Sequence, residues 1–300
     1  PLTLIAESDL NDPVVITPRD SGGYGMAAQW DDDVHHALHA LLTGERQGYY
    51  VDFGSLHVLA KTFTCAFLHD GTYSTFRGRV HGAPVDVEHI PGSRFVVCLQ
   101  NHDQVGNRAV GDRLPELTSP ELVQVGAVLL LTCPFTPMLF MGEEWAASTR
   151  WPFFTSHPEP ELAKVTGQGR IEEFADHGWD TAQMIDPQDP QAYRSAVLDW
   201  DEAGRPGHAE VLSLYQRLIA LRAAEPDLHD TDLRHVAVGY DDAERWLVVQ
   251  RGGFRVAANI AGEPRTVPVA GGTVVLATGT ATPGPTGLTL GPQTAAVVRV

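Results

Sequence analysis

The sequence predicts an α/β protein in two parts: the second half of a (β/α)₈ barrel over residues 1–226, followed by an all-β sandwich over residues 227–300. Short apolar runs that turn abruptly polar, with helical segments between them, indicate the barrel strands. Short alternating segments separated by Gly and Pro turns indicate the sandwich. With 300 residues, of which 43% are hydrophobic, the chain is long enough to bury a large core.

The apolar runs predict parallel strands, of which those at residues 2–6 and 136–141 are expected to be buried and that at 95–100 to be buried on both faces. They lie at residues 2–6, 26–30, 95–100 and 136–141. Continuous runs rich in β-branched and aromatic residues are typical of such strands. Parallel α/β folds carry their chemistry at the carboxyl ends of the strands, which is where these runs become polar. We therefore expect a pocket at that edge.

The intervening segments predict helices. These lie at residues 34–42, 55–67, 121–131 and 208–224. The acidic residues at 31–33 precede the first of them, where carboxylates complement the positive end of the helix dipole. Residues 146–205 form an excursion dense in Trp, Phe, His and Asp, which we interpret as a cover over a site. The sequence does not fix whether this cover moves.

From about Leu233 the pattern changes to short alternating segments. The predicted strands lie at residues 234–238, 246–250, 255–259, 273–276 and 295–300. We interpret this module as a brace for the barrel.

Composition narrows the class of partner and the compartment. A formal charge of −17 argues against nucleic acid, whose phosphates need clustered Lys and Arg. No signal peptide and no apolar run near the ~18 residues of a membrane span is visible. Cys98 and Cys133 lie inside apolar runs, which favours buried thiols in a reducing cytoplasm. No spacing resembles a metal site, so neither a metal nor another cofactor is expected.

Two carboxylates follow predicted strands directly. Glu7 comes after the first run and Asp103 after the third. Each alone fits a turn former or helix cap equally well. Two such groups at one rim of one barrel favour catalysis.

Three motifs resemble the α-amylase superfamily of glycoside hydrolases and transferases, in which a barrel precedes a β-sandwich. They are Leu4-Ile-Ala-Glu7, Gln100-Asn-His-Asp103 and Met141-Gly-Glu-Glu144. Longer stretches resemble, within that superfamily, the malto-oligosyltrehalose trehalohydrolase family. These stretches are residues 7–13, 29–36, 43–50, 100–108, 152–157 and 186–190.

The resemblance implies a retaining glycosidase that cleaves the α-1,4-glucosidic bond next to the terminal trehalose of malto-oligosyltrehalose, releasing trehalose. It implies Glu7 as general acid/base and Asp103 as the group that holds the distorted sugar. The superfamily's nucleophile is an Asp in a motif that this sequence lacks. The chain begins at Pro1 without Met, so we expect the nucleophile in a preceding N-terminal half and an inactive chain without it.

The other substrate-binding candidates each have a structural alternative. His102, Gln104 and Asn107 are expected to bond sugar hydroxyls, or else to shape the strand end. Trp30 offers an apolar face to a pyranose ring or packs in the core. Asp32 binds hydroxyls or caps the following helix, with capping slightly favoured.

Two further candidates follow from the resemblance. Phe76 and Arg77 are expected to recognise the trehalose end, the alternative being a core aromatic beside a solvated Arg. Glu143 is expected on the leaving-group side, whereas Glu144 is more typical of a structural residue.

Two rival functions remain open. A glucan branching enzyme shares the scaffold and transfers the glucan to a sugar hydroxyl instead of to water. A non-catalytic carbohydrate-binding barrel would need no nucleophile.

Overall fold

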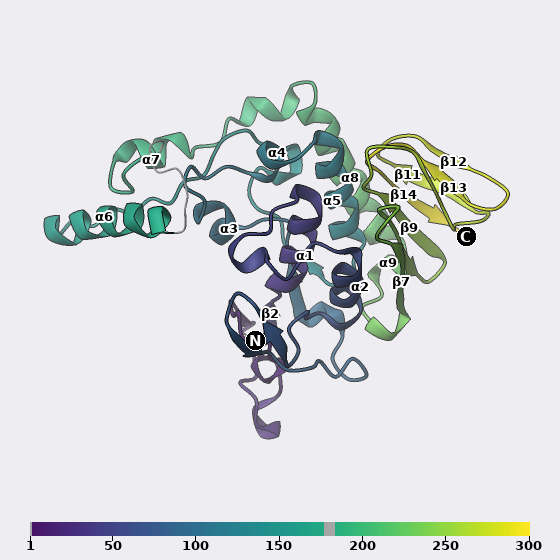
Figure 1. Ribbon diagram of the computed structural model, residues 1–300, viewed down its shortest axis with the longest axis horizontal. Coiled ribbons are helices and arrows are strands. Elements are labelled where there is room, and N and C mark those ends of the chain that lie inside the picture. The colour runs from purple at the N-terminus through teal and green to yellow at the C-terminus, as the bar shows by residue number, and fades with distance from the viewer. Residues whose placement is uncertain (1, 177–183) are drawn as a thin grey trace. The chain divides into compact units, whose positions relative to one another are not determined.

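The computed structural model describes residues 2–176 and 184–300, with only the backbone for 173–176 (Figure 1). The chain divides into two compact units. Unit 1 consists of Pro1–Leu99, Pro120–Met138 and Ser213–Val300, and unit 2 of Gln100–Ser119 and Leu139–Leu212. The predicted excursion at 146–205 lies in unit 2, and its residues 177–183 lie outside the described chain.

Unit 1 contains a four-stranded parallel sheet whose strand order follows the sequence. Its strands, in order, are β1 Ile5–Ala6, β2 Ala28–Trp30, β5 Phe95–Val97 and β6 Thr136–Pro137. Each lies inside an apolar run that predicted it. β5 is buried throughout, because it has a strand on either side and helices over it.

The prediction that residues 2–6 are buried is wrong. Leu2 is 83% exposed and Ile5 is 52% exposed. β1 is an edge strand that pairs only with β2 in the described chain, so its apolar side chains have no neighbour on the other side. β6 is the opposite edge, and Thr136 on it is exposed as well.

The four predicted helices are present. The helices of the described chain are α1 Asp32–Thr43, α2 Leu56–Cys65, α3 His102–Gly106, α4 Leu114–Leu117, α5 Pro120–Thr132, α6 Pro160–Asp176, α7 Pro190–Ser195, α8 His208–Ala224 and α9 Pro226–His229. α5 is buried on nearly every side because it packs between α1 and the C-terminal sheet, which explains its apolar sequence. Cys98 and Cys133 are buried free thiols, as predicted.

The C-terminal strands form two antiparallel sheets. The first has the order β11-β14-β9-β8-β7, with bounds β7 Val236–Asp241, β8 Trp246–Arg251, β9 Phe254–Asn259, β11 Thr273–Ala277 and β14 Thr294–Arg299. The second has the order β10-β13-β12, with bounds β10 Arg265–Val267, β12 Ala281–Pro283 and β13 Leu288–Leu290. One core cluster draws side chains from both, for example Val298 of the first and Leu290 of the second. The two sheets therefore pack as a sandwich.

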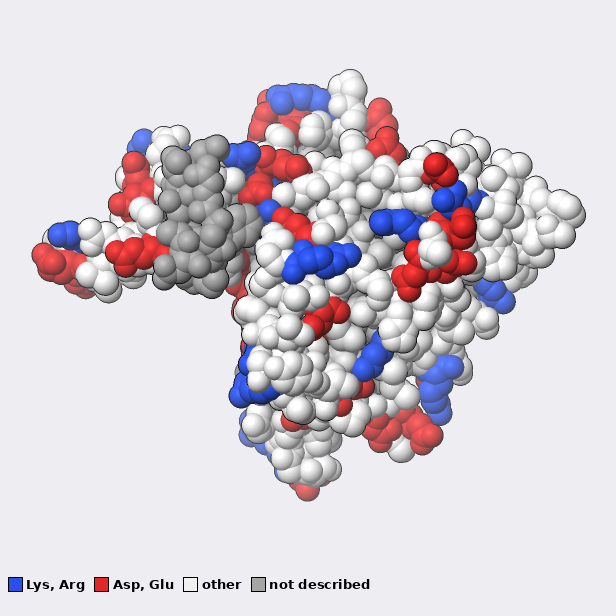
Figure 2. Space-filling model, viewed as in Figure 1, with Lys and Arg blue, Asp and Glu red and all other residues white. Residues whose placement is uncertain are grey.

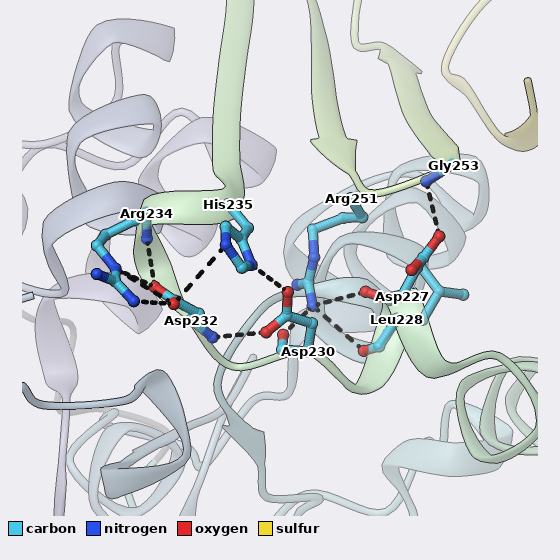
Figure 3. A network of polar contacts seen from close by, with 8 residues as sticks. All are labelled: Asp227, Leu228, Asp230, Asp232, Arg234, His235, Arg251 and Gly253. Carbon is cyan, nitrogen blue, oxygen red and sulfur yellow. Dashed lines mark hydrogen bonds and ion pairs between the residues drawn. The ribbon is translucent and has the colours of Figure 1, made fainter. Parts of the chain in front are cut away.

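The buried Arg251 joins this sandwich to the helices of unit 1 (Figure 3). The guanidinium of Arg251 on β8 is buried and donates to the carbonyl oxygens of Thr132 (2.9 Å), Leu228 (3.3 Å) and Asp230. Arg222 on α8 donates to the carbonyl oxygens of Cys133 and Phe135, at 2.7 Å each. Together they satisfy carbonyl groups at and beyond the carboxyl end of α5. Burial lowers the pKa of Arg251 to about 10, which leaves it charged at neutral pH.

Candidate active site

Strand register brings the first candidate residues of unit 1 to one edge of the parallel sheet. Ala6 pairs with Gln29 in the ladder, so Glu7 follows β1 at the level of Trp30 at the end of β2. Trp30 in turn pairs with Val96 of β5. Glu7 is exposed and Trp30 is half-buried. Because the strands are parallel, these side chains lie at the same, carboxyl edge.

Asp31, not Asp32, caps helix α1. Its Oδ1 accepts hydrogen bonds from the backbone N–H groups of Asp33 (3.1 Å) and Val34 (3.3 Å). The favoured interpretation of Asp32 as the cap is therefore wrong. β2 ends at Trp30, so Asp31 takes the cap position and Asp32 is the first residue of the helix. Asp32 is half-buried at the first helical position, and its role toward a sugar remains a prediction.

The hairpin of β3 (Thr72–Ser74) and β4 (Arg79–His81) carries Phe76 and Arg77 at its turn. Arg77 Nη1 lies 3.0 Å from Asp9 Oδ2, two residues after Glu7. Phe76 is 51% exposed, and its ring meets that of Tyr49 edge-on, with centroids 6.0 Å apart. The exposed Phe76 and the Asp9-paired Arg77 thus lie beside the segment that follows β1.

Two histidines of α1 pack against the tyrosines that follow this helix. His35 lies 3.1 Å from the Tyr50 hydroxyl, and the ring of His36 stacks on Tyr49 with centroids 4.9 Å apart. Burial lowers the pKa of His35 well below its usual value and that of His36 to about 3. Both imidazoles are therefore neutral at neutral pH. Desolvation acts on the neighbouring Asp33 in the opposite sense and raises its pKa.

In unit 2, Asp103 is held by its own chain. Asn101 Oδ1 caps α3 by accepting from the backbone N–H groups of Asp103 (2.7 Å) and Gln104 (3.3 Å). Asn107 Nδ2, one turn later, donates to Asp103 Oδ1. Arg170 of α6 donates to Asn107 Oδ1 and extends this network. Asp103 itself stays exposed, so its carboxylate is fixed in place while remaining accessible.

The remaining candidates of unit 2 differ in exposure. His102 is exposed, and its ring meets Trp151 edge-on at 6.5 Å between centroids. Gln104 and Glu143 are 7% and 3% exposed, so neither faces solvent in this structure. Their substrate-binding roles remain predictions.

The candidates fall into two groups, one in each unit. Unit 1 holds Glu7, Trp30, Asp32, Phe76 and Arg77, and unit 2 holds His102, Asp103, Gln104, Asn107 and Glu143. The sequence did not point to Asp9, Tyr49 or Trp151 as supporting residues, or to Asn101 as the cap of α3. Asp9, Tyr49 and Asn101 lie within the stretches that carry the family resemblance, which was the available signal.

The described residues offer no site for a metal and no membrane span. Among them, no group of three or more His, Cys, Asp or Glu side chains is arranged to hold a metal ion. No described helix is long and apolar enough to cross a bilayer.

The fold is similar to that of about half the chain in solved structures named as alpha amylases. A putative alpha amylase from Salmonella typhimurium superposes with a TM-score of 0.85 at 30% sequence identity, covering 100% of this chain and 51% of that one. An alpha-amylase from H. orenii superposes with a TM-score of 0.55 over 100% of this chain and 53% of its own, and at 17% identity it supports the fold alone.

More specifically, the chain resembles malto-oligosyltrehalose trehalohydrolases, as its motifs predict. It is 53% identical to the enzyme of Rhizobium sp. (strain M-11) over 93% of this chain and 47% of that protein. It is 51% identical to that of Brevibacterium helvolum over 100% of this chain and 51% of that protein. The chain thus spans about half the length of these relatives. Residues 231–297 also match a family described as a domain of unknown function, DUF3459.

Proposed function

We propose that the complete protein is a retaining glycoside hydrolase that cleaves the α-1,4-glucosidic bond next to the terminal trehalose of malto-oligosyltrehalose, releasing trehalose. The observation that carries the proposal is 51–53% identity to relatives of that name over nearly the whole chain. The stretches that predicted this family hold Glu7 and Asp103, together with the Asp9, Tyr49 and Asn107 around them.

The proposed architecture is a barrel that this chain completes only in part. Residues 1–226 would supply the second half of a (β/α)₈ barrel, and residues 227–300 the sandwich that braces it. The exposed edges of β1 and β6 support this, because a closed barrel pairs every strand on both sides. The partner at those edges would be the N-terminal half of the same enzyme, carrying the Asp nucleophile.

Glu7 is the proposed general acid/base. Its carboxylic acid protonates the glycosidic oxygen as the Asp of the other half attacks the anomeric carbon, the two carboxyl groups lying about 5–5.5 Å apart in a retaining enzyme. The trehalose leaves with that proton, and the glucan remains as an ester on the Asp. Glu7, now a carboxylate, takes a proton from water, which hydrolyses the ester and restores both groups.

Asp103 is proposed to bind hydroxyls of the sugar that reacts. Such contacts strengthen as the ring flattens toward an oxocarbenium-like state, and a carboxylate also favours the positive charge that develops there. Two hydrogen bonds support this role: the backbone N–H of Asp103 donates to Asn101 Oδ1, and Asn107 Nδ2 donates to the Asp103 carboxylate. A preorganised group loses little entropy in the transition state. His102 would add a hydrogen bond to the same sugar.

The trehalose end would be recognised by Phe76 and Arg77. Two observations support this role: the ring of Phe76 is exposed, and Arg77 pairs with Asp9 in the segment that follows Glu7. Trp30 would give an apolar platform, and Asp32, Gln104, Asn107 and Glu143 further polar contacts. On the face shown in Figure 2, Lys and Arg lie scattered among acidic residues, which suits a neutral sugar better than nucleic acid. The buried free thiols favour the cytoplasm as compartment.

The test uses the complete protein with maltotriosyl-trehalose and, as a control with the same number of glucose rings, maltopentaose. We expect free trehalose and maltotriose from the first and much slower cleavage of the second. Oxygen from labelled water should appear at the new reducing end of maltotriose. Branched or elongated products without trehalose would favour a branching enzyme, and tight binding without turnover would favour a non-catalytic barrel.

A further inference from the structure

Unit 2 contains an aromatic pocket that the proposed chemistry does not use. It is a cavity of about 240 Å³, open to solvent, between the segment after β6 and helix α7. Its principal lining residues, the aromatic pocket from here on, are Met141, Trp151, Phe154, Tyr193, Val197 and Trp200. The described lining contains no Asp, Glu, Lys or Arg, so its recognition chemistry is that of rings and aliphatic groups.

The rim of the aromatic pocket is unusually exposed for such large apolar side chains. Trp200 is 71% exposed, Tyr193 58% and Val197 56%. Single exposed apolar residues are ordinary on protein surfaces, but contiguous ones around a hollow mark a binding site. Tyr and Trp also carry a polar O–H or N–H, which suits a ligand with both apolar faces and hydroxyls.

A run of ring contacts connects the aromatic pocket to the Asp103 segment. The ring of His102, next to Asp103, meets Trp151 with centroids 6.5 Å apart. Trp151 meets Phe154 at 5.7 Å, and Phe154 meets Tyr193 at 5.7 Å. The backbone N–H of Trp151 donates to the carbonyl of Gly111 at 2.8 Å, which fixes this central ring. A ligand on Asp103 and His102 can therefore continue along the rings into the pocket.

We propose that the aromatic pocket binds the α-1,4-glucan arm of the substrate, on the side of the cleaved bond away from trehalose. The proposal rests on the proposed function for the identity of the glucan. A pyranose ring presents C–H groups on its faces and hydroxyls at its rim, which matches exposed indole and phenol rings. An uncharged glucan of several rings also fits a lining without charged groups better than an ionic ligand does.

The aromatic pocket makes the enzyme's affinity depend on the length of the glucan. Short substrates end before the pocket, so removing its rings leaves them unaffected. Long substrates gain contact with Trp200 and Tyr193 in the ground state and transition state alike. Loss of that uniform binding raises KM and leaves kcat unchanged.

The experiment compares the complete wild-type protein with Trp200→Ala, Tyr193→Ala and a control, Tyr24→Ala, which removes an equally exposed ring from unit 1. Maltosyl-trehalose and maltohexaosyl-trehalose serve as short and long substrates. We expect the KM for the long substrate to rise about tenfold in either pocket variant, with the KM for the short substrate and both kcat values unchanged. Trp200→Phe, which keeps a ring, should restore most of the affinity.

Maltoheptaose binding, followed by tryptophan fluorescence, separates this proposal from the proposed function. Weaker maltoheptaose binding in Trp200→Ala supports the pocket even if the protein releases no trehalose. Equal changes in KM for short and long substrates, or no change in either, would overturn the proposal. A lower unfolding temperature of Trp200→Ala with an unchanged KM ratio would also overturn it, because the preceding half of the protein would then be the occupant.

Discussion

The two carboxylates at the centre of the proposal rest on different supports. In unit 2, Asp103 lies in the first turn of the short helix α3. Its backbone N–H donates to the cap residue Asn101, and Asn107 donates to its carboxylate. In unit 1, Glu7 follows β1, an edge strand with Ile5 half exposed. Asp103 is therefore positioned by contacts within about four residues, whereas Glu7 follows a strand that pairs with β2 alone in the described chain.

This difference indicates which part of the proposed site depends on the rest of the protein. Local capping fixes a side chain wherever its helix forms. A strand end is fixed by its neighbours in the sheet, and β1 has only one in the described chain. We expect Asp103 to keep its geometry in this chain alone and Glu7 to gain its final position when a second strand pairs with β1.

The largest effect should come from replacing Glu7. In the complete protein, Glu7→Gln keeps the shape of the side chain but removes the proton that the leaving trehalose needs, so kcat should fall about 10³-fold. Binding of maltotriosyl-trehalose, measured by calorimetry, should change little. A Glu7→Gln variant with near-normal turnover would refute its assignment as the acid.

The second effect concerns the buried histidines beneath the Glu7 side of the site. His36 has a folded-state pKa of about 3, below the ~6.5 of the unfolded chain, because burial is its largest cause and the nearby His39, Arg77 and His69 add to it. Below pH 6.5 the unfolded chain therefore binds a proton that the folded chain does not. Stability falls as the pH drops from 6.5 toward 3, by about 1.4 kcal/mol per pH unit for this group.

Urea unfolding at pH 7 and pH 5 measures this loss. His36→Gln should reduce the difference in the free energy of unfolding between the two pH values by about 2 kcal/mol. His36→Phe, a second replacement that cannot titrate, should do the same. If the variants lose as much stability as wild type between pH 7 and pH 5, protonation of His36 in the unfolded chain is not the cause of the loss.

The third effect tests the local support of Asp103. Asn101→Ala removes the cap of α3 and should lower the free energy of unfolding by about 1 kcal/mol, together with a fall in kcat of about tenfold. Ser55→Ala, which removes the cap of α2, is the matched control. It should cost similar stability and leave kcat unchanged. Equal kcat in both variants would mean that Asn101 stabilises the fold without positioning Asp103.

The smallest effect concerns the Asp9–Arg77 pair on the Glu7 side. Asp9 is largely exposed, with a side-chain exposure of 63%, so Asp9→Asn should change stability by less than about 0.5 kcal/mol. If the pair orients Arg77 toward trehalose, the KM for maltotriosyl-trehalose should rise about threefold. The corresponding loss of binding free energy is smaller than that of a full hydrogen bond to a charged group. The KM for maltopentaose should stay constant. A parallel rise for both sugars would contradict a role in trehalose recognition.

The sequence predicted the parts of the molecule that depend on local pattern. Apolar runs located all four parallel strands, and the segment at residues 121–131 predicted α5. The short strands β10, β12 and β13 were missed because each is only three residues long, is bordered by Gly or Pro, and pairs with the other short strands of the same sheet.

The errors arose where burial or capping depends on neighbours. Residues 2–6 have the composition of a buried strand, yet Ile5 is exposed because a strand's burial is decided by what pairs beside it. Asp31, Asp32 and Asp33 are equivalent as caps in sequence, and only the end of β2 selects Asp31. The Asp9–Arg77 pair joins residues far apart in the chain, which no local pattern reveals.

A crystal structure of the complete Glu7→Gln variant with bound maltotriosyl-trehalose would test the central claim most directly. The account predicts that the amide at position 7 contacts the glycosidic oxygen next to trehalose while the carboxylate of Asp103 bonds hydroxyls of the adjoining glucose. Finding the two side chains in separate cavities, or the sugar bound away from both, would contradict it.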